Sequence, residues 1–310
     1  MASQVVIQTE KLTKVYSGGK PALEDLSLTV APGEIFGYLG PNGAGKTTTI
    51  RLLLDLIRPT SGRAAIFGLD TIAQSVAIRQ RIGFLPGELN LWDRLTAREI
   101  VNYMGNLRGG VNTAYVNELA ERLNFDLTKR MRTYSTGNKR KLGLILALMH
   151  KPDLLILDEP SSGLDPLMQQ TFNQLMLEAK ANGQTVFLSS HVLNEVQAIC
   201  DRVGILRDGK LQAVETVERL TRVDFRKVTL KFRDAVSPLL VSSVAGVSKV
   251  SAEGANVLSL QLAGDFDPLL KAVSSAYVQD ILVETPTLED IFLTFYGGQP
   301  ANNHREKVMS

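Results

Sequence analysis

The sequence has a single cysteine, Cys200, so the chain cannot form an internal disulfide. Cys200 lies in the apolar phase of a run typical of a helix, HVLNEVQAICDRV, and we interpret it as a small core residue of a cytosolic protein. Long hydrophobic runs are also missing, because the longest, LGLILALM, falls far short of the ~20 residues that span a bilayer. The sequence therefore predicts a chain that does not cross a membrane by itself.

An excess of one charge is absent too. The chain has 34 Lys and Arg against 32 Asp and Glu, a net charge of +2, and no basic stripe. This balance argues against nucleic acid as a partner bound by bulk electrostatics. A chain of 310 residues is large enough for one large domain or two ordinary ones with a sizeable core. Its function must be inferred from motifs.

Strand and helix patterns predict an α/β core. The first 35 residues contain alternating strands, VVIQTEKL and SLTVAPGEIFGYL, which favour an N-terminal antiparallel β subdomain. From Ile35 onward, apolar strands alternate with helical patterns: IFGYL, a helix through LIRP, RIGFLP, LLILDEP, TVFLSS, the helix that contains Cys200, and a hairpin turned at Asp208-Gly209. Fully apolar strands between helices are typical of a mostly parallel sheet that is covered on both faces.

Two further regions complete the predicted organisation. Residues 88–150 read as helical throughout, with Trp92, Leu95, Ile100 and Met104 on one side, and predict a helical insertion within a first domain of residues 1–222. Residues 223–298 read as strand, helix, strand, strand, helix, strand, helix, the last helix being TLEDIFLTFYG. This order predicts a small C-terminal α+β domain of the ferredoxin-like kind. The tail, residues 299–310, lacks periodicity and is predicted to be disordered.

The stretch GPNGAGKT fits the phosphate-binding pattern G-x-x-x-x-G-K-[ST] between a buried strand and a helix. This context predicts the core of a P-loop NTPase rather than an incidental glycine-rich turn. Lys46 would neutralise the β/γ-phosphates and Thr47 would bind Mg²⁺. The nucleotide-binding residues predicted here are Gly40, Pro41, Asn42, Gly43, Ala44, Gly45, Lys46, Thr47 and Thr48.

Two carboxylates end the apolar strand LLILDEP, where ionised side chains are unfavourable unless they are paired or metal-bound. We predict that Asp158 reaches the Mg²⁺ shell. Glu159 should point the other way and orient or deprotonate the attacking water. The alternative is a plain turn at a strand end.

Five motifs occur in the following order: GPNGAGKTT, YSTGNKRK, LLILDEP, SSGLDP and SSH. Through these motifs and their order, the chain closely resembles the ATP-binding-cassette (ABC) ATPases over about residues 4–220. The resemblance implies that two cassettes pack head to tail and trap two ATP molecules between them. It assigns Ser135, Thr136, Gly137 and Asn138 to the signature that serves the partner's ATP, although Tyr134 and Thr136 depart from the commonest form. Taken alone, Ser135 could equally be an ordinary helix cap.

The same resemblance implies roles for four more residues. Tyr16 would stack on adenine, or else pack at the core or the sheet edge. Asp165 would act at the dimer seam, and His191 would contact the γ-phosphate unless it is purely structural. Where the family usually carries glutamine, this chain has Gly87 with Glu88 beside it. Either Glu88 brings a carboxylate to Mg²⁺, or water fills that place and Glu88 faces the permease or solvent.

The implied function is the ATP-hydrolysing subunit of a membrane transporter, with ATP and Mg²⁺ as cofactors and a separate transmembrane permease as partner. It would act at the cytoplasmic face of the cell membrane, and the motifs most resemble the branch that exports drugs, lipids or polysaccharides. A soluble cassette of translation or DNA repair is the alternative, but only 88 residues separate Lys46 from Ser135 and only one cassette is present. A small-molecule P-loop kinase would leave the signature and His191 unexplained.

Overall fold

The computed structural model describes residues 5–221 and 225–284. Its internal contacts divide the chain into two compact units, residues 1–218 and 219–310, and each unit is described by itself.

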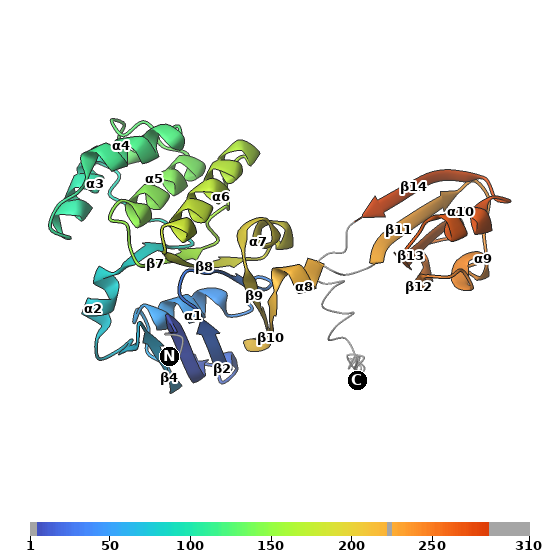
Figure 1. Cartoon of the computed structure of the whole chain (residues 1–310), viewed down its shortest axis with the longest axis horizontal. Coiled ribbons are helices and arrows are strands. Elements are labelled where there is room, and N and C mark those ends of the chain that lie inside the picture. Colours follow the sequence, from blue (N-terminus) through green and yellow to red (C-terminus); the bar gives the residue numbers. More distant parts are fainter. Residues whose placement is uncertain (1–4, 222–224, 285–310) are drawn as a thin grey trace, which may run out of the picture. The chain divides into compact units, whose positions relative to one another are not determined.

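The first unit contains two β-sheets with helices between and around them (Figure 1). Its central sheet has the strand order β10-β9-β3-β8-β7-β6, and all of these strands except the edge strand β10 run parallel. The strands are β3 (Ile35–Leu39), β6 (Ile82–Leu85), β7 (Leu154–Asp158), β8 (Thr185–Ser190), β9 (Arg202–Arg207) and β10 (Lys210–Thr216). The predicted mostly parallel sheet is confirmed, as is the hairpin at Asp208-Gly209, where both residues have positive φ.

The second sheet of this unit is antiparallel, with the order β2-β1-β4-β5. Its strands are β1 (Ile7–Val15), β2 (Pro21–Val30), β4 (Ser61–Ile66) and β5 (Leu69–Asp70). The sequence patterns predicted an N-terminal antiparallel subdomain but missed β4 and β5. Only the last half of β4 is buried, so its apolar signal is short.

Helix α1 (Lys46–Leu53) lies between the two sheets and contacts β2, β4 and β7. Its apolar face, with Ile50 and Leu53, joins one core cluster with Ile7 of β1 and Tyr38 of β3. The helix ends at Leu53, so the prediction that it runs through LIRP, which ends at Pro59, was six residues too long. Asp55, with a φ of 55°, cannot continue a helix.

Helices α6 (Pro166–Ala181) and α7 (Leu193–Ile199) contact β8, and α7 also contacts β3. A Cβ atom on Gly37 of β3 would lie 2.7 Å from Val196 of α7, so glycine permits this close packing. Cys200 is the C-cap of α7, which is shorter than predicted, and it is buried as expected. Burial raises the pKa of its thiol. A short helix, α2 (Ser75–Gln80), completes this unit outside the insertion, and α8 (Val217–Thr221) spans the boundary between the two units.

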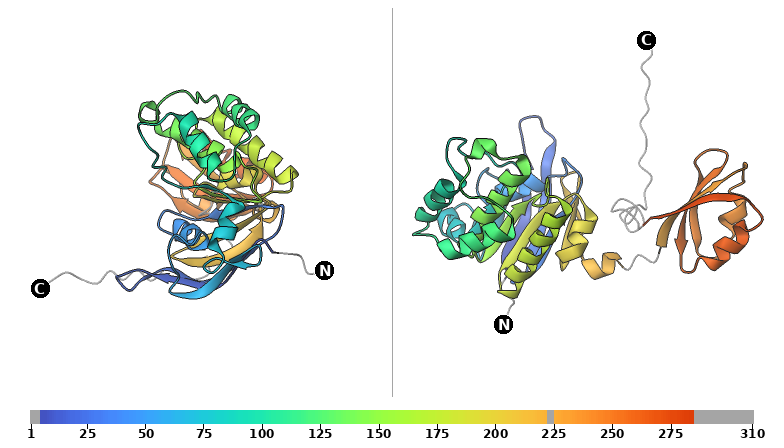
Figure 2. Two further views of the ribbon diagram at one scale, coloured as in Figure 1. Left: turned by 90° about the vertical axis from the view of Figure 1, so that its left-hand side faces the viewer. Right: turned by 90° about the horizontal axis from the view of Figure 1, so that it is seen from above.

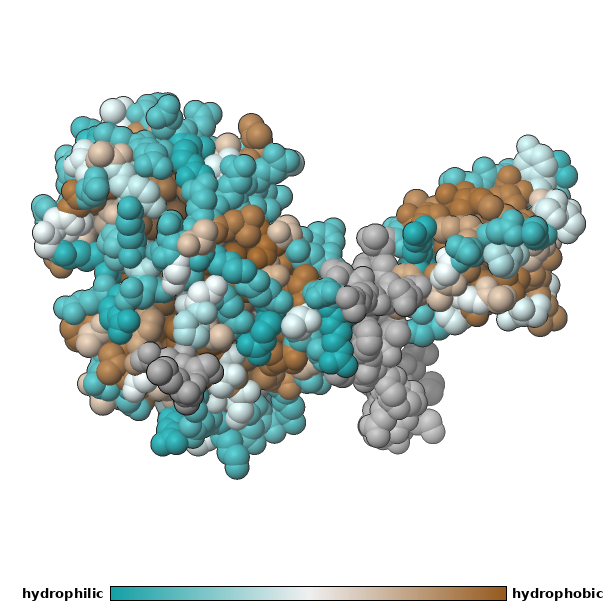
Figure 3. Space-filling view, in the orientation of Figure 1, coloured by the Kyte–Doolittle hydropathy of each residue, from teal (hydrophilic) through white to brown (hydrophobic). Residues whose placement is uncertain are grey.

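The helical insertion consists of α3 (Ala97–Asn106), α4 (Thr113–Arg122), the 3₁₀ turn η1 (Met131–Thr133) and α5 (Thr136–Leu148). Residues 87–95 are not helical, which contradicts the prediction of helix throughout. Trp92 lies in this stretch, 47% exposed, and makes an edge contact with Tyr103 at 5.3 Å rather than joining the core. Much of the outer surface of the insertion is hydrophilic (Figure 3).

The second unit is a β-α-β-β-α-β domain with the sheet order β12-β13-β11-β14, and α9 and α10 cover one face of that sheet (Figure 2). Its elements are β11 (Phe225–Phe232), α9 (Leu239–Ser242), β12 (Val247–Ala252), β13 (Val257–Ala263), α10 (Asp267–Val273) and β14 (Val278–Glu284). The ferredoxin-like prediction is therefore confirmed for these elements. The final helix and the disordered tail, predicted beyond residue 284, lie outside the described residues. Within the described ranges, no helix has the length and apolar character needed to cross a bilayer.

Candidate functional site

The loop between β3 and α1 is the candidate phosphate site. Gly45, the N-cap residue of α1, has a φ of 108°, a conformation that favours glycine. A Cβ atom on Gly40 would lie 2.3 Å from the carbonyl oxygen of Leu206, so this position has no room for a side chain. The backbone therefore turns tightly into the start of α1, where unpaired N–H groups and the helix dipole attract an anion.

Two neighbouring segments hold this loop directly by backbone hydrogen bonds, and a third, β2, holds one of those segments. Gly209, in the turn between β9 and β10, donates its N–H to the carbonyl oxygen of Ala44 at 3.0 Å. The carbonyl oxygen of Gly209 accepts from the N–H of Glu24 in β2 at 2.8 Å. Gly40 donates its N–H to the carbonyl oxygen of Ser190 at 3.2 Å. The loop is thus fixed by the protein itself.

Lys46 brings a positive charge to this loop. It is the first residue of α1 and is only 6% exposed. Its ammonium group donates to the carbonyl oxygens of Gly40 at 2.6 Å and Pro41 at 3.2 Å, and it pairs with Oε1 of Glu159 at 3.1 Å. Its charge is thereby held against the loop, where it can pair with phosphate oxygens.

Asp158, at the end of β7, is buried and bonded through both carboxylate oxygens. Oδ2 accepts from the hydroxyl of Thr47 at 2.9 Å, and Oδ1 accepts from the hydroxyl of Ser189 at 2.6 Å. Ser189 lies opposite Asp158 in the register of β7 and β8. The sequence analysis did not single out Ser189, although it is the first residue of the quoted SSH motif.

The oxygen atoms of Thr47 and Asp158 suit Mg²⁺, which takes oxygen ligands and is commonly bound by one or two carboxylates together with phosphates. The pair is brought together as predicted. Glu88 is exposed and has no ion pair among the described residues. Gly87 lies next to this pair, because a Cβ atom on it would lie 3.2 Å from Oδ2 of Asp158.

Glu159 does not point the other way, contrary to the prediction. Its φ is 50°, which interrupts the alternation of side chains at the end of β7. Oε1 therefore faces Lys46, and Oε2 lies 2.7 Å from Nδ1 of His191. The backbone N–H of Glu159 donates to the hydroxyl of Ser189 at 3.0 Å. A carboxylate placed between an ammonium group and an imidazole is held in one direction and can accept a proton from water.

The signature segment forms a second helix start. Ser135 is the N-cap of α5, and its hydroxyl accepts the backbone N–H three residues later at 3.3 Å. A Cβ atom on Gly137 would lie 2.6 Å from the carbonyl oxygen of Gly163, so α5 begins against the loop that precedes α6. Asp165 is the N-cap of α6. In the described part of the chain, no hydrogen bond or ion pair joins residues 135–138 to residues 40–48.

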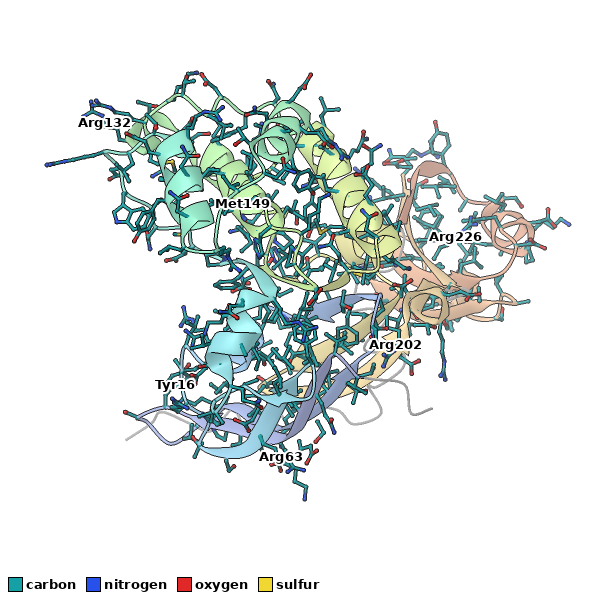
Figure 4. The ribbon with its side chains drawn as sticks, turned by 60° about the vertical axis from the view of Figure 1, so that its left-hand side comes forward. Tyr16, Arg63, Arg132, Met149, Arg202 and Arg226 are labelled. Carbon is teal, nitrogen blue, oxygen red and sulfur yellow. The ribbon has the colours of Figure 1, made fainter. Side chains whose placement is uncertain are left out.

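Tyr16 follows β1 and is 44% exposed, so it is not a core residue. The ammonium group of Lys14 lies 5.3 Å from the centre of its ring. Figure 4 shows Tyr16 beside the antiparallel sheet, whereas Arg132 extends from the outer end of the helical insertion. An exposed ring of this kind is available for stacking.

Comparison with known proteins assigns the chain to a family. The family model described as ABC transporter matches residues 23–162. The bacitracin transport ATP-binding protein BcrA of Bacillus licheniformis is 41% identical over 209 residues, which are 66% of this chain and 68% of BcrA. The linearmycin resistance ATP-binding protein LnrL of Bacillus subtilis is 32% identical, with 94% of this chain and 98% of LnrL covered. The chain belongs to the ABC transporter ATP-binding proteins.

Solved structures agree with this assignment of the cassette. The ATP-binding subunit of an ABC transporter matches with a TM-score of 0.64 and 29% identity, covering 70% of this chain and 92% of that one. A dimeric cassette, MJ0796 bound to ADP and Pi, shares the fold with a TM-score of 0.61 at 24% identity, covering 68% of this chain and 98% of that one. The chain is thus an ABC ATPase, and it binds ATP.

Proposed function

We propose that the chain is the ATP-hydrolysing subunit of an exporter and works as a head-to-tail homodimer with a separate permease. One observation carries the proposal. Lys46, Thr47, Asp158, Glu159 and His191 converge at the carboxyl ends of parallel strands, as a site for Mg-ATP requires.

Each residue of this site has a proposed role. The backbone of Gly40–Thr48 binds the phosphates, and Lys46 neutralises their β/γ oxygens. Thr47 and Asp158 would hold Mg²⁺, which supplies charge neutralisation at the phosphates when it is bound. Glu159 orients and deprotonates the attacking water, and His191 contacts the γ-phosphate. Tyr16 stacks on adenine.

The position of the signature supports the proposed dimer. Ser135 and its three following residues begin a helix that can bind an anion, yet they make no bond to the phosphate loop of their own chain. A second copy placed head to tail would supply that anion, and Asp165 beside α5 would lie at the same seam. The solved cassette MJ0796, which shares the fold, is a dimer.

Export is supported by two relatives whose names refer to bacitracin transport and linearmycin resistance. The chain would act at the cytoplasmic face of the membrane through its permease, and it would not bind nucleic acid. We propose a cassette domain of residues 1–222, with its helical insertion at 88–150, and an accessory domain of residues 223–298. A soluble role in translation or DNA repair is not favoured by these relatives.

Mixing two inactive variants tests the shared sites. Ser135→Arg damages the partner's site, whereas Lys46→Ala damages its own site. A mixed dimer therefore has one site with both lesions and one site with neither. Random 1:1 mixing makes half of the dimers mixed, so about a quarter of the wild-type ATPase rate should return. No recovery at any ratio, in samples where mixed dimers are demonstrated, would contradict the head-to-tail arrangement.

Purification from membranes tests the permease. The tagged chain, extracted from membranes in mild detergent, should co-purify with a protein that contains several apolar segments of ~20 residues. Substrate carried by that complex can then be identified by mass spectrometry. A chain that is recovered without any membrane protein would contradict the transporter assignment.

A further inference from the structure

Arg140 of α5 is a buried cation whose hydrogen bonds all go to backbone carbonyls. It is 5% exposed. Nη1 donates to Pro86 at 2.7 Å and Gly87 at 2.8 Å, Nη2 donates to Asp158 and Glu159, and Nε donates to Pro160 at 3.4 Å. A guanidinium group has five N–H donors, so every donor has one carbonyl acceptor.

These five carbonyls belong to two loops of the proposed catalytic site. Pro86 and Gly87 follow β6. Asp158 is the last residue of β7, the parallel neighbour of β6, and Glu159 and Pro160 follow it. Arg140 itself belongs to the helix that begins at Ser135. One planar group therefore ties the signature helix to both loops.

The charge of Arg140 has no carboxylate partner within ion-pair distance in the part of the chain that the structure describes. Burial lowers the pKa of Arg140, while the negative charges of Asp158 and Glu159 oppose this shift. Burying a cation among carbonyls is unfavourable compared with an apolar side chain of the same size. An apolar side chain would be enough to fill the space at this position. A guanidinium group is needed only if several carbonyls have to be directed to one point.

The carbonyl directions matter most at Glu159, whose φ of 50° is a conformation that non-glycine residues rarely adopt. Adjacent carbonyls on a strand normally point to opposite sides. Here the carbonyl oxygens of Asp158 and Glu159 both accept from Nη2 of Arg140, which this turn allows. The same turn directs the carboxylate of Glu159 toward Lys46 and His191.

We propose that Arg140 is a positioning residue: it holds Glu159 in its left-handed conformation and joins it and the Gly87 loop to the signature helix. The inference rests on the proposed role of Glu159 in hydrolysis. Five residues separate Ser135 from Arg140, about 7.5 Å along a rigid helix. A shift of the helix start by the partner's nucleotide therefore moves the carbonyls that set the direction of Glu159. Arg140 itself touches no nucleotide.

The first test is Arg140→Lys, which keeps the charge but has three donors on a flexible stem instead of five in a plane. We expect ATP hydrolysis to fall by about 10- to 100-fold, because a misplaced catalytic group loses that much rate. The ATP dissociation constant should stay within threefold of wild type, since the phosphate loop is intact. Arg108→Lys is the matched control. Arg108 also donates to backbone carbonyls, those of Arg79, Gln80 and Ile82, and its replacement should leave the hydrolysis rate unchanged.

The second test asks whether Arg140 acts through Glu159. In a Glu159→Gln background, Arg140→Lys should cause no further loss of the residual rate, because the group that it positions is already inactive. An equal fold loss in both backgrounds, or a wild-type rate in Arg140→Lys, would overturn the proposal. Failure of Glu159→Gln alone to slow hydrolysis would instead contradict the role of Glu159. If Arg140→Lys does not fold, Arg140→Gln removes the buried charge, keeps a planar donor and is measured against the same outcomes.

Discussion

Replacing Lys46 by alanine tests the phosphate site most directly. Lys46 is nearly buried, and its ammonium group faces Gly40, Pro41 and the carboxylate of Glu159. The substitution removes the cation that would pair with the β/γ-phosphates. It also leaves the carboxylate of Glu159, which is 21% exposed, with the imidazole of His191 but without the ammonium group. Two separate effects on ATP affinity follow.

The first effect is the loss of attraction. Two charge-assisted hydrogen bonds to phosphate, at about 1.5 to 3 kcal/mol each, amount to about 3 to 6 kcal/mol, or about 10² to 10⁴ in affinity. The second effect is repulsion between Glu159 and the γ-phosphate. Two like charges about 5 Å apart repel by about 3 kcal/mol at an effective dielectric constant of about 20, and partial exposure reduces this to about 1 to 2 kcal/mol. The double variant Lys46→Ala/Glu159→Gln should therefore bind ATP about tenfold more tightly than Lys46→Ala.

Titration calorimetry at fixed Mg²⁺ measures these dissociation constants. Lys180→Ala is a suitable control, because Lys180 also forms an ion pair, with Asp201 at 2.5 Å, but lies on α6 outside the phosphate loop. Its affinity for ATP should equal that of the wild type. Binding by Lys46→Ala within threefold of wild type would refute the assignment of the loop. A double variant no tighter than Lys46→Ala would refute the electrostatic role given to Glu159.

Three further outcomes are expected. Glu159→Gln should keep its affinity for Mg-ATP and hydrolyse it about 10² to 10⁴ times more slowly than the wild type. It should also form an ATP-dependent dimer in gel filtration. A monomer at saturating Mg-ATP would count against the dimer. Gly87→Gln should retain ATPase activity within about tenfold, because the added Cβ needs a shift of only a few tenths of an ångström from Asp158; a complete loss would show that the loop tolerates no side chain. Hydrogen bonds from Arg122 lower the pKa of Glu178, so this pair stabilises the folded chain above the usual carboxyl pKa of 4.5 and stops doing so as the pH falls through the lower folded value. Glu178→Gln should therefore cost up to about 1 kcal/mol in urea unfolding at neutral pH, and a pH-independent difference would contradict this reasoning.

The sequence predicted the parts of the site that depend on contiguous motifs. The loop from Gly40 to Thr47 lies between a buried strand and a helix, as its flanking residues required. Asp158 reaches Thr47 because parallel strands end at one edge of the sheet. The direction of Glu159 was missed, because strand alternation is a rule for extended backbone and this residue leaves the extended region.

Arg140 could not be recognised as a ligand of five carbonyls from its own neighbourhood in the sequence. The two loops that it joins are more than 50 residues apart, and backbone carbonyls carry no residue-type signal. The prediction extended the helices of the insertion too far for another reason. Apolar residues such as Trp92 fitted a helical period although they lie outside any helix. Helix starts were nevertheless encoded, since Thr96 and Glu99 form a capping box and Ser135 caps α5.

The backbone hydrogen bonds that join the phosphate loop to Gly209 and to Ser190 have a kinetic consequence. Because the protein's own backbone bonds hold the loop, we expect little conformational entropy to be lost when ATP binds. The association rate of ATP should then be limited by diffusion and by the replacement of the present partners of Lys46 by phosphate oxygens. Closure of the loop should not limit it. If the chain works as the proposed homodimer, nucleotide turnover by the isolated subunit should be governed by the association and separation of two cassettes, and its rate should depend on protein concentration.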